Sequence, residues 1–230
     1  MKSTLTTTIQ TSLKSPFLAG LSAADLDCVL AAARPRQLLA RSIVVNQGSP
    51  ADYLFLLAKG RARFFFVTED GRKLLLHWLV PGDIFGAMAL LSQSSSYLVG
   101  TEMVRHGCVL AWDRYTIRDL AARCPGLWEN AMSVAADYLS FYVSSHVVLT
   151  CNDAKQRLAH ALITLGRGIG EKRPSGIALE ATNEELASAA NITPFTTSRF
   201  LSEWQRKGVV AKWRGKILLK RPERLLQTLS

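Results

Sequence analysis

Long apolar runs are absent from this chain of 230 residues. No segment approaches the roughly 18 uninterrupted apolar residues that a membrane-spanning helix requires, which argues against a membrane protein. The opening stretch, MKSTLTTTIQTSLKSP, is polar and rich in hydroxyl groups, and it lacks the apolar core of a secretory signal peptide. We therefore expect a cytoplasmic protein with no membrane partner, whose residues 1–16 form a flexible N-terminal arm.

Cysteine and histidine are few and scattered. Cys28, Cys108, Cys124 and Cys151 form no C-x-x-C pair, so the sequence predicts buried free thiols and neither a zinc site nor a disulfide framework. The four histidines form no H-x-H pair, no Ser-His-Asp arrangement is legible, and no glycine-rich loop precedes a helix in a phosphate-binding context. We expect no catalytic residues, no metal ligands and no enzyme. A metal-dependent, cupin-like barrel enzyme is the alternative, and metal analysis would decide it.

Acidic residues are scarce in the C-terminal part of the chain. Residues 151–230 hold 14 Lys and Arg against 7 Asp and Glu, whereas residues 1–150 hold 14 against 11. The segment 199–221 carries eight basic residues and a single acid, Glu203. A field of this sign suits DNA, RNA or an anionic membrane, although a merely solvated face would have the same composition.

The N-terminal half alternates between helical and strand patterns. Residues 17–33 predict short helices, with Ser22 as an N-cap and Asp25 as its partner three residues later. Residues 36–112 are short apolar runs separated by NQGSP, TEDGRK and PGD, which predicts an antiparallel β sandwich or barrel. A long helix then follows at about 126–151.

An apolar stripe on that long helix follows alternating steps of four and three residues, the spacing of a two-stranded coiled coil. We interpret it as the seam of a homodimer, although a helix packed on its own β domain would show a similar stripe. The residues of this seam are Trp128, Met132, Ala135, Leu139, Tyr142, His146 and Leu149.

The C-terminal region predicts a helix, a tight turn and a second helix. After a helix at 155–165, a loop at 166–176 and a short strand IALEA, Thr182 caps a helix and Asn191 ends it in the left-handed conformation. Thr193 caps the next helix, with Pro194 at its first position. The face formed by Thr197, Phe200, Leu201 and Trp204 is expected to be buried.

The outer face of the second helix and a basic two-stranded wing within GVVAKWRGKILLK suit a DNA duplex. Phosphate contacts are expected from Thr182, Thr193 and Lys216, and base contacts from Arg199, Ser198, Thr196 and Phe195. The DNA-binding residues are therefore Thr182, Thr193, Phe195, Thr196, Ser198, Arg199, Lys212, Arg214 and Lys216. A winged helix that contacts protein instead of DNA is the alternative, and salt-insensitive binding would favour it.

The chain resembles the CRP/FNR family of bacterial transcription regulators over more than 180 residues. The resemblance rests on NQGSPADYLFLLAKGRARFF (Gly48, Gly60), on LVPGDIFG (Pro81 to Gly86), on the long helix and on the winged helix-turn-helix. It implies an α+β protein with an antiparallel β-roll of the cyclic-nucleotide-binding, jelly-roll type at 17–125. A dimerisation helix at 126–152 and a winged helix-turn-helix domain at 153–230 would follow. The implied partners are double-stranded DNA, a second copy of the chain and RNA polymerase.

Departures from the family's pattern bear on the effector. Cyclic-AMP binders carry a glutamate and an Arg-Ser or Arg-Thr pair where this chain has Ala87, Tyr97 and Leu98, which argues against cyclic AMP. No cysteine precedes Cys28, which argues against the iron–sulfur centre of the oxygen-sensing branch.

The effector is therefore unidentified. One alternative is a haem- or redox-responsive regulator, for which the available axial ligands are His77, His106, His146 and Cys108. The other is a pocket filled by the chain's own side chains, which would need no effector. The expected pocket residues are Arg63, His77, Gly86, Ala87, Tyr97, Leu98, Tyr138 and Tyr142. In the recognition helix, Pro194 and Phe195 replace the early polar residues of the family, whereas Ser198 and Arg199 are kept.

Overall fold

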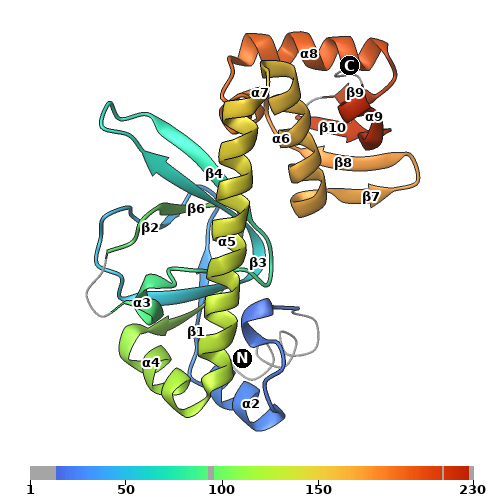
Figure 1. The fold of residues 1–230 in the computed structure, drawn as a ribbon. Coiled ribbons are helices and arrows are strands. Elements are labelled where there is room, and N and C mark those ends of the chain that lie inside the picture. The colour runs from blue at the N-terminus through green and yellow to red at the C-terminus, as the bar shows by residue number, and fades with distance from the viewer. Residues whose placement is uncertain (1–13, 93–95, 214, 228–230) are drawn as a thin grey trace. The chain divides into compact units, whose positions relative to one another are not determined.

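The computed structural model describes residues 14–92, 96–213 and 215–227, and Figure 1 shows its elements. The chain divides into two compact units, residues 1–139 and 140–230. The division falls within the long helix α5 (Pro125–Cys151). Each unit combines helices with an antiparallel sheet, so the α+β prediction is confirmed.

The described part of the N-terminal unit begins with a short 3-10 helix, η1 (Pro16–Leu18), and with α2 (Ala23–Ala31). Ser22 caps α2 as predicted, since its side chain accepts a hydrogen bond from the backbone N–H of Asp25. The prediction of a flexible arm is wrong at its C-terminal end. Ser15 is buried, and its hydroxyl donates to the carbonyl oxygen of Gly82 at 2.7 Å, whereas residues 1–13 lie outside the description.

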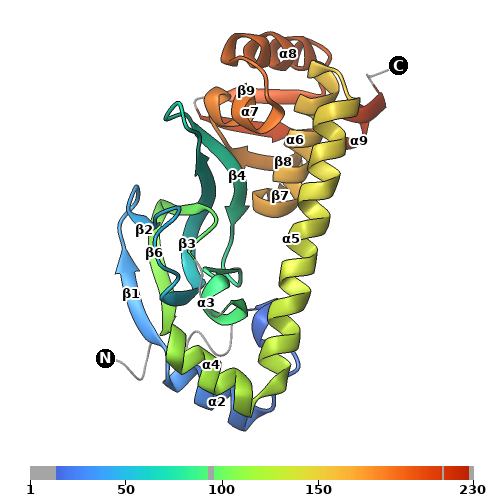
Figure 2. The same cartoon turned by 60° about the vertical axis from the view of Figure 1, so that its left-hand side comes forward.

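The sheet of this unit is antiparallel, as predicted for residues 36–112. Strands β1, β6, β3 and β4 lie in that order (Figures 1 and 2). In addition, β2 pairs with β6, and β5 pairs with β3. The strands are β1 (Arg34–Leu38), β2 (Ile43–Val45), β3 (Tyr53–Val67), β4 (Lys73–Leu79), β5 (Ile84–Phe85) and β6 (Gly100–Asp113), and α3 (Met88–Leu91) follows β5.

Alternate residues of β3 face two different cores, because successive side chains of a strand point to opposite sides of the sheet. Leu54 and Leu56 pack in a core with residues of α2, with the start of α5 and with α4 (Arg114–Arg123), a helix that the sequence did not predict. Phe55 and Leu57 pack inside the roll, where the ring of Phe55 stacks on Phe85 at 4.9 Å.

The C-terminal unit surrounds a second antiparallel sheet in the order β7-β8-β10-β9. Its elements are α6 (Ala154–Ile169), β7 (Glu171–Arg173), β8 (Gly176–Glu180), α7 (Asn183–Ala190), α8 (Pro194–Arg206), β9 (Val210–Trp213), β10 (Lys216–Leu219) and α9 (Pro222–Gln227). The sequence had not predicted β7 or α9.

The predicted loop at 166–176 is wrong, because α6 continues to Ile169 and β7 follows it directly. The glycine that suggested a loop has a packing role instead. A Cβ added at Gly166 would lie 3.1 Å from Cδ1 of Leu219. The helix thus uses glycine where it packs closely against the sheet.

The cysteines are all free, as predicted, but only Cys108 and Cys124 are buried. Cys28 and Cys151 are exposed, so the expectation of buried thiols is wrong for these two. Within the described ranges, the structure has no helix that is long and apolar enough to cross a membrane.

Candidate nucleic-acid interface and sensor domain

Two capped helices and a left-handed residue form the helical pair α7–α8 (Figure 1). Thr182 and Glu185 make the predicted capping box, in which each side chain accepts a hydrogen bond from the other residue's backbone N–H. Asn191 ends α7 with φ 49°, and Thr193 caps α8 with Pro194 at its first position. These local features fix where α8 begins, and therefore which of its residues face outward.

The inward face of α8 is as predicted for three of its four residues. Thr197, Leu201 and Trp204 are fully buried, whereas Phe200 is only partly buried. The hydroxyl of Thr197 donates to the carbonyl oxygen of Thr193 at 3.1 Å. On the outward face, Phe195 is 77% exposed. Arg199 is also exposed, with its guanidinium carbon 5.0 Å from the centre of the Phe200 ring. The outward face of α8 therefore offers the ring of Phe195 and the cation of Arg199 to a partner.

The two threonine hydroxyls at the start of α8 bond to one another. Oγ1 of Thr193 and Oγ1 of Thr196 are 2.9 Å apart, and Thr193 also accepts from the backbone N–H of Thr196. Ser198 is partly buried. Among the expected base readers, Phe195 and Arg199 are thus the ones with exposed side chains.

Arg157 of α6 holds the turn between the two helices. Its Nε donates to the carbonyl oxygen of Ala190 at 3.0 Å and its Nη2 to that of Asn191 at 3.3 Å. Its Nη1 reaches the carbonyl oxygens of Leu149 and Asn152, both at 3.4 Å. The sequence analysis missed this residue, because no local pattern brings Arg157 to a turn that lies more than 30 positions away.

Glu203, the single acid in the basic segment 199–221, lies between two lysines. Its Oε1 accepts from Nζ of Lys155 on α6 and from Nζ of Lys207, each at 2.8 Å. These hydrogen bonds lower the pKa of Glu203 to about 2. The carboxylate therefore joins α6 to α8, and its charge is balanced locally.

The wing consists of β9 and β10, as predicted, with Gly215 at φ 70° in the turn. Nζ of Lys212 donates to Oδ1 of Asn183 at 3.1 Å, and Nζ of Lys216 lies 3.4 Å from Oε1 of Glu180. Trp213 at the tip is 43% exposed. The predicted contact residue Arg214 lies outside the described residues.

In the N-terminal unit, Tyr97 fills the interior beside Gly86. The phenol hydroxyl accepts from the backbone N–H of Tyr53 at 3.0 Å and donates to the carbonyl oxygen of the same residue at 2.9 Å. A Cβ added at Gly86, which has φ 74°, would lie 3.1 Å from the Tyr97 ring. Burial raises the pKa of Tyr97, so the phenol keeps the proton that it donates.

The other expected pocket residues do not form a single polar site. Arg63 pairs with Glu102 at 3.4 Å, and Lys73 pairs with the same carboxylate. The imidazole of His77 packs edge-on against Tyr138 at 5.4 Å, and burial lowers the pKa of His77 to about 4. Leu98 is 67% exposed and so does not fill the interior.

The remaining pocket and ligand candidates each have a separate local environment. Ala87 is the N-cap of α3 and offers no side-chain cap, and Tyr142 belongs to the C-terminal unit. His106 and His146 are exposed, whereas Cys108 is buried with its thiol directed to the carbonyl oxygen of Val109. In the described part of the chain, no group of three or more His, Cys, Asp or Glu side chains is placed to hold a metal ion.

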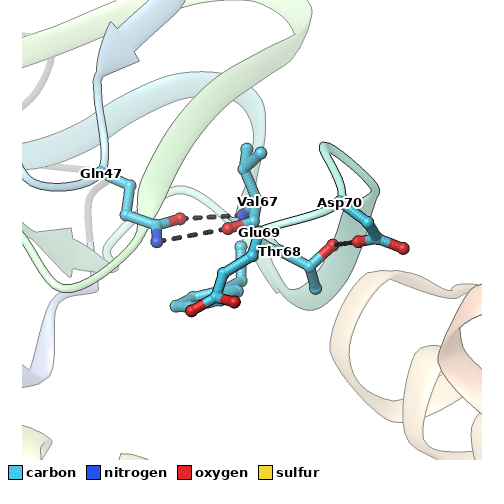
Figure 3. A pocket seen from close by; sticks show the side chains of 6 residues that line it. Gln47, Val67, Thr68, Glu69 and Asp70 are labelled. Atoms are coloured by element: carbon cyan, nitrogen blue, oxygen red, sulfur yellow. Dashed lines mark hydrogen bonds between the residues drawn. The ribbon is translucent and has the colours of Figure 1, made fainter.

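A hollow beside the β3–β4 hairpin is lined by Gln47, Phe66, Val67, Thr68, Glu69 and Asp70 (Figure 3). The carboxamide of Gln47 accepts from the backbone N–H of Val67 at 2.8 Å and donates to its carbonyl oxygen at 3.5 Å. Thr68 donates to Asp70. These polar groups hold the hairpin, so the hollow has a structural explanation.

Two families match the sequence one after the other along the chain. A family described as a cyclic nucleotide-binding domain covers residues 35–124, and one described as a Crp-like helix-turn-helix domain covers residues 156–228. A cyclic AMP receptor protein of Thermus thermophilus is 29% identical over 199 residues, which are 85% of this chain and 88% of that protein. The chain belongs to the CRP/FNR family.

Two solved structures have the same fold. The c-di-GMP responsive global regulator CLP of Xanthomonas campestris gives a TM-score of 0.77 at 19% identity, covering 87% of this chain and 100% of that one. A mutant of CooA from Carboxydothermus hydrogenoformans gives a TM-score of 0.72 at 25% identity, covering 88% of this chain and 90% of that one. Together, the helix-turn-helix family and the relative from Thermus thermophilus show that the chain is a transcription regulator of the CRP/FNR type with a DNA-binding helix-turn-helix.

The N-terminal domain of this CRP/FNR regulator does not fit a cyclic nucleotide. The hydroxyl of Tyr97 is engaged on both sides by the backbone of Tyr53, and Ala87 offers no carboxylate to a ribose. The guanidinium of Arg63 is paired with Glu102. A cyclic phosphate would therefore meet a phenol ring where it needs a cation.

The stripe on α5 is exposed in part. Trp128, Met132, Leu139 and Leu149 are 43%, 48%, 65% and 38% exposed, and His146 is exposed too. Ala135 and Tyr142 are partly buried. Two further apolar residues that the sequence analysis missed are Val143 and Val147, at 57% and 52% exposure.

Proposed function

We propose that this CRP/FNR regulator acts as a homodimer that reads a palindromic DNA operator through α8, without cyclic AMP. The observation that carries the proposal is the outward face of α8. Two successive caps fix the start of the helix and leave Phe195 and Arg199 exposed, one helical turn apart. Arg199 is suited to bidentate bonding with guanine, while Ser198 and Thr196 complete the reading face.

Contacts with DNA phosphates come from Thr182, Thr193 and the wing lysines Lys212 and Lys216. At the surface, Lys212 is hydrogen-bonded to Asn183 and Lys216 is paired with Glu180, and such modest contacts exchange readily for phosphate. RNA polymerase is the expected second partner. The protein acts in the cytoplasm as a regulator, not as an enzyme.

A second copy of the chain is the partner for the exposed apolar side chains of α5. Trp128, Met132, Leu139 and Val143 follow each other at steps of four, seven and four residues, which keeps them on one side of a helix. Pairing along this seam would present two copies of α8 to successive major grooves, about 34 Å apart.

The control of DNA binding differs from that of a cyclic-AMP-dependent regulator. Tyr97 supplies, from the chain itself, the hydrogen-bonding group that fills the interior beside Gly86. We therefore assign effector-independent binding to this protein. A partly buried His77 that packs on two aromatic rings is explained as part of the packing of the roll, which leaves no specific observation in favour of haem.

The experiment is selection of binding sites from random duplex DNA by the purified protein without ligand, at one moderate salt concentration. We expect enrichment of a palindrome whose half-sites are about 10 base pairs apart. Enrichment of nothing, with only salt-sensitive background binding, would contradict effector independence. Enrichment of a single half-site would contradict the dimer.

A further inference from the structure

Phe195 presents a large apolar side chain on the outward face of the first turn of α8. Its ring is 77% exposed although it follows directly after the N-cap and the proline. Most exposed positions of this helix carry polar side chains, such as Ser202 and Arg206. A phenylalanine ring exposed to this extent gains stability when a partner covers it, because burial of apolar surface is favourable.

The backbone beneath the ring is fixed. The ring of Pro194 fixes the φ of that residue, directly before Phe195, and the hydroxyl of Thr193 accepts from the backbone N–H of Thr196 at 3.1 Å. The ring therefore extends from a set backbone position, and a contact with a partner has to order only the two χ angles of the side chain.

The hydroxyls next to Phe195 are directed elsewhere. That of Thr196 bonds to the cap residue Thr193, and that of Thr197 is buried against the backbone. In the first turn of α8, the hydroxyls of Thr193 and Thr196 are thus bonded to one another and that of Thr197 to the backbone, so the ring of Phe195 is the apolar group that this turn offers. In the major groove, the apolar feature that distinguishes one base from the others is the C5-methyl group of thymine.

We propose that Phe195 determines specificity by contacting a thymine methyl group in each half-site; this rests on the proposed function of α8 as the DNA reader. Arg199 lies four residues later on the same face, about 6 Å along the helix axis. Because base pairs are about 3.4 Å apart, the thymine lies within roughly two base pairs of the guanine that Arg199 contacts.

The test removes the methyl group from the DNA and the ring from the protein. In the selected operator, each thymine near that guanine is replaced in turn by deoxyuridine, which changes nothing but the methyl group. For the unmodified protein, we expect affinity to fall about fourfold per methyl group at one position in each half-site. Phe195→Ala should bind the thymine and deoxyuridine duplexes equally.

Two further variants keep the test decisive. Phe195→Leu retains an apolar group and should keep part of the preference for thymine. Trp213→Ala removes an exposed aromatic side chain of the wing, and whatever its effect on overall affinity, its ratio of thymine to deoxyuridine affinity should equal that of the unmodified protein. Equal thermal unfolding midpoints would show that the substitutions leave the fold intact, as expected for exposed residues.

Three outcomes would overturn the inference. If the unmodified protein prefers its operator over a scrambled duplex but binds thymine and deoxyuridine alike, Phe195 does not read the methyl group and α8 still reads DNA. If Phe195→Ala keeps the full preference for thymine, another residue reads it. If the protein has no preference for the operator at all, the proposed function fails and this inference fails with it.

Discussion

Nε of Arg157 donates a hydrogen bond of 3.0 Å to the carbonyl oxygen of Ala190, which lies 33 residues later at the end of α7. A second bond from the same guanidinium reaches Asn191, the left-handed residue of the turn. The carbonyl groups at a helix C-terminus lack partners within the helix, and a cation there also interacts favourably with the helix dipole. One side chain thus supports the turn that orients the recognition helix.

Replacing Arg157 by alanine should therefore weaken both folding and DNA binding. We expect the free energy of unfolding to fall by about 1–3 kcal/mol, because hydrogen bonds from a charged group to carbonyl oxygens, some of them partly buried, are lost. Denaturant unfolding and operator affinity measure the two effects. Arg167→Ala removes the same charge from an exposed position of α6 and should change the stability by less than about 0.5 kcal/mol. Equal effects of the two substitutions would contradict a positioning role for Arg157.

Removing the hydroxyl of Tyr97 should destabilise the N-terminal unit. In Tyr97→Phe, both the N–H and the carbonyl group of Tyr53 lose a partner, and we expect a loss of about 1–3 kcal/mol. Tyr115→Phe is the control, since Tyr115 is 85% exposed.

Thermal unfolding should also show no shift when cyclic AMP is added to the unmodified protein. A clear upward shift with cyclic AMP would contradict our account of the pocket.

The pH dependence of stability should contain a contribution from His77. Its pKa in the folded protein is about 4, below the ordinary value of 6.5, so the unfolded chain binds a proton that the folded one excludes. The contribution of neutral His77 to the free energy of unfolding is therefore fully present above about pH 6.5, and up to about 3 kcal/mol of it is lost as the pH drops towards 4. His77→Phe should lack this loss, whereas the carboxylates titrate alike in both proteins. Parallel curves for the two proteins would show that His77 does not titrate in this way.

Glu203 should make a smaller contribution, at lower pH. Its folded pKa of about 2 lies below its ordinary value of 4.5, so its stabilising effect is present above about pH 4.5 and is lost as the pH falls towards 2. Because the side chain is partly solvated, Glu203→Gln should cost less than about 1 kcal/mol. Urea unfolding at pH 7 and pH 3 would measure this cost, which should shrink at the lower pH. A cost that stays the same at both pH values would exclude the two lysines as its cause.

Local chemistry made much of this fold predictable. The caps at Ser22, Thr182 and Thr193 depend on residues at most three positions apart, so the sequence alone locates the helix starts. The alternating strands and the basic wing follow in the same way from short patterns. Family resemblance added the order of the domains.

The features that could not be predicted depend on contacts between residues far apart in the sequence. The helical end of α6 depends on Gly166 packing against Leu219, and composition alone suggested a loop there. Tyr97 meets the backbone of Tyr53 across 44 positions, and Arg157 meets Ala190 across 33. Neither pairing has a local signal in the sequence, because tertiary packing brings these residues together.

The central claim is that α8 reads DNA sequence, and the most direct measurement compares Arg199→Ala with the unmodified protein. Both are titrated, at fixed salt, against the selected operator and against variants with each base pair replaced in turn. We predict a loss of about 1–3 kcal/mol that is confined to one base pair in each half-site, where the alanine variant no longer discriminates. Lys216→Ala should instead weaken binding to all sequences alike. An equal loss across every sequence for Arg199→Ala would make Arg199 a phosphate contact and would contradict base reading by this residue.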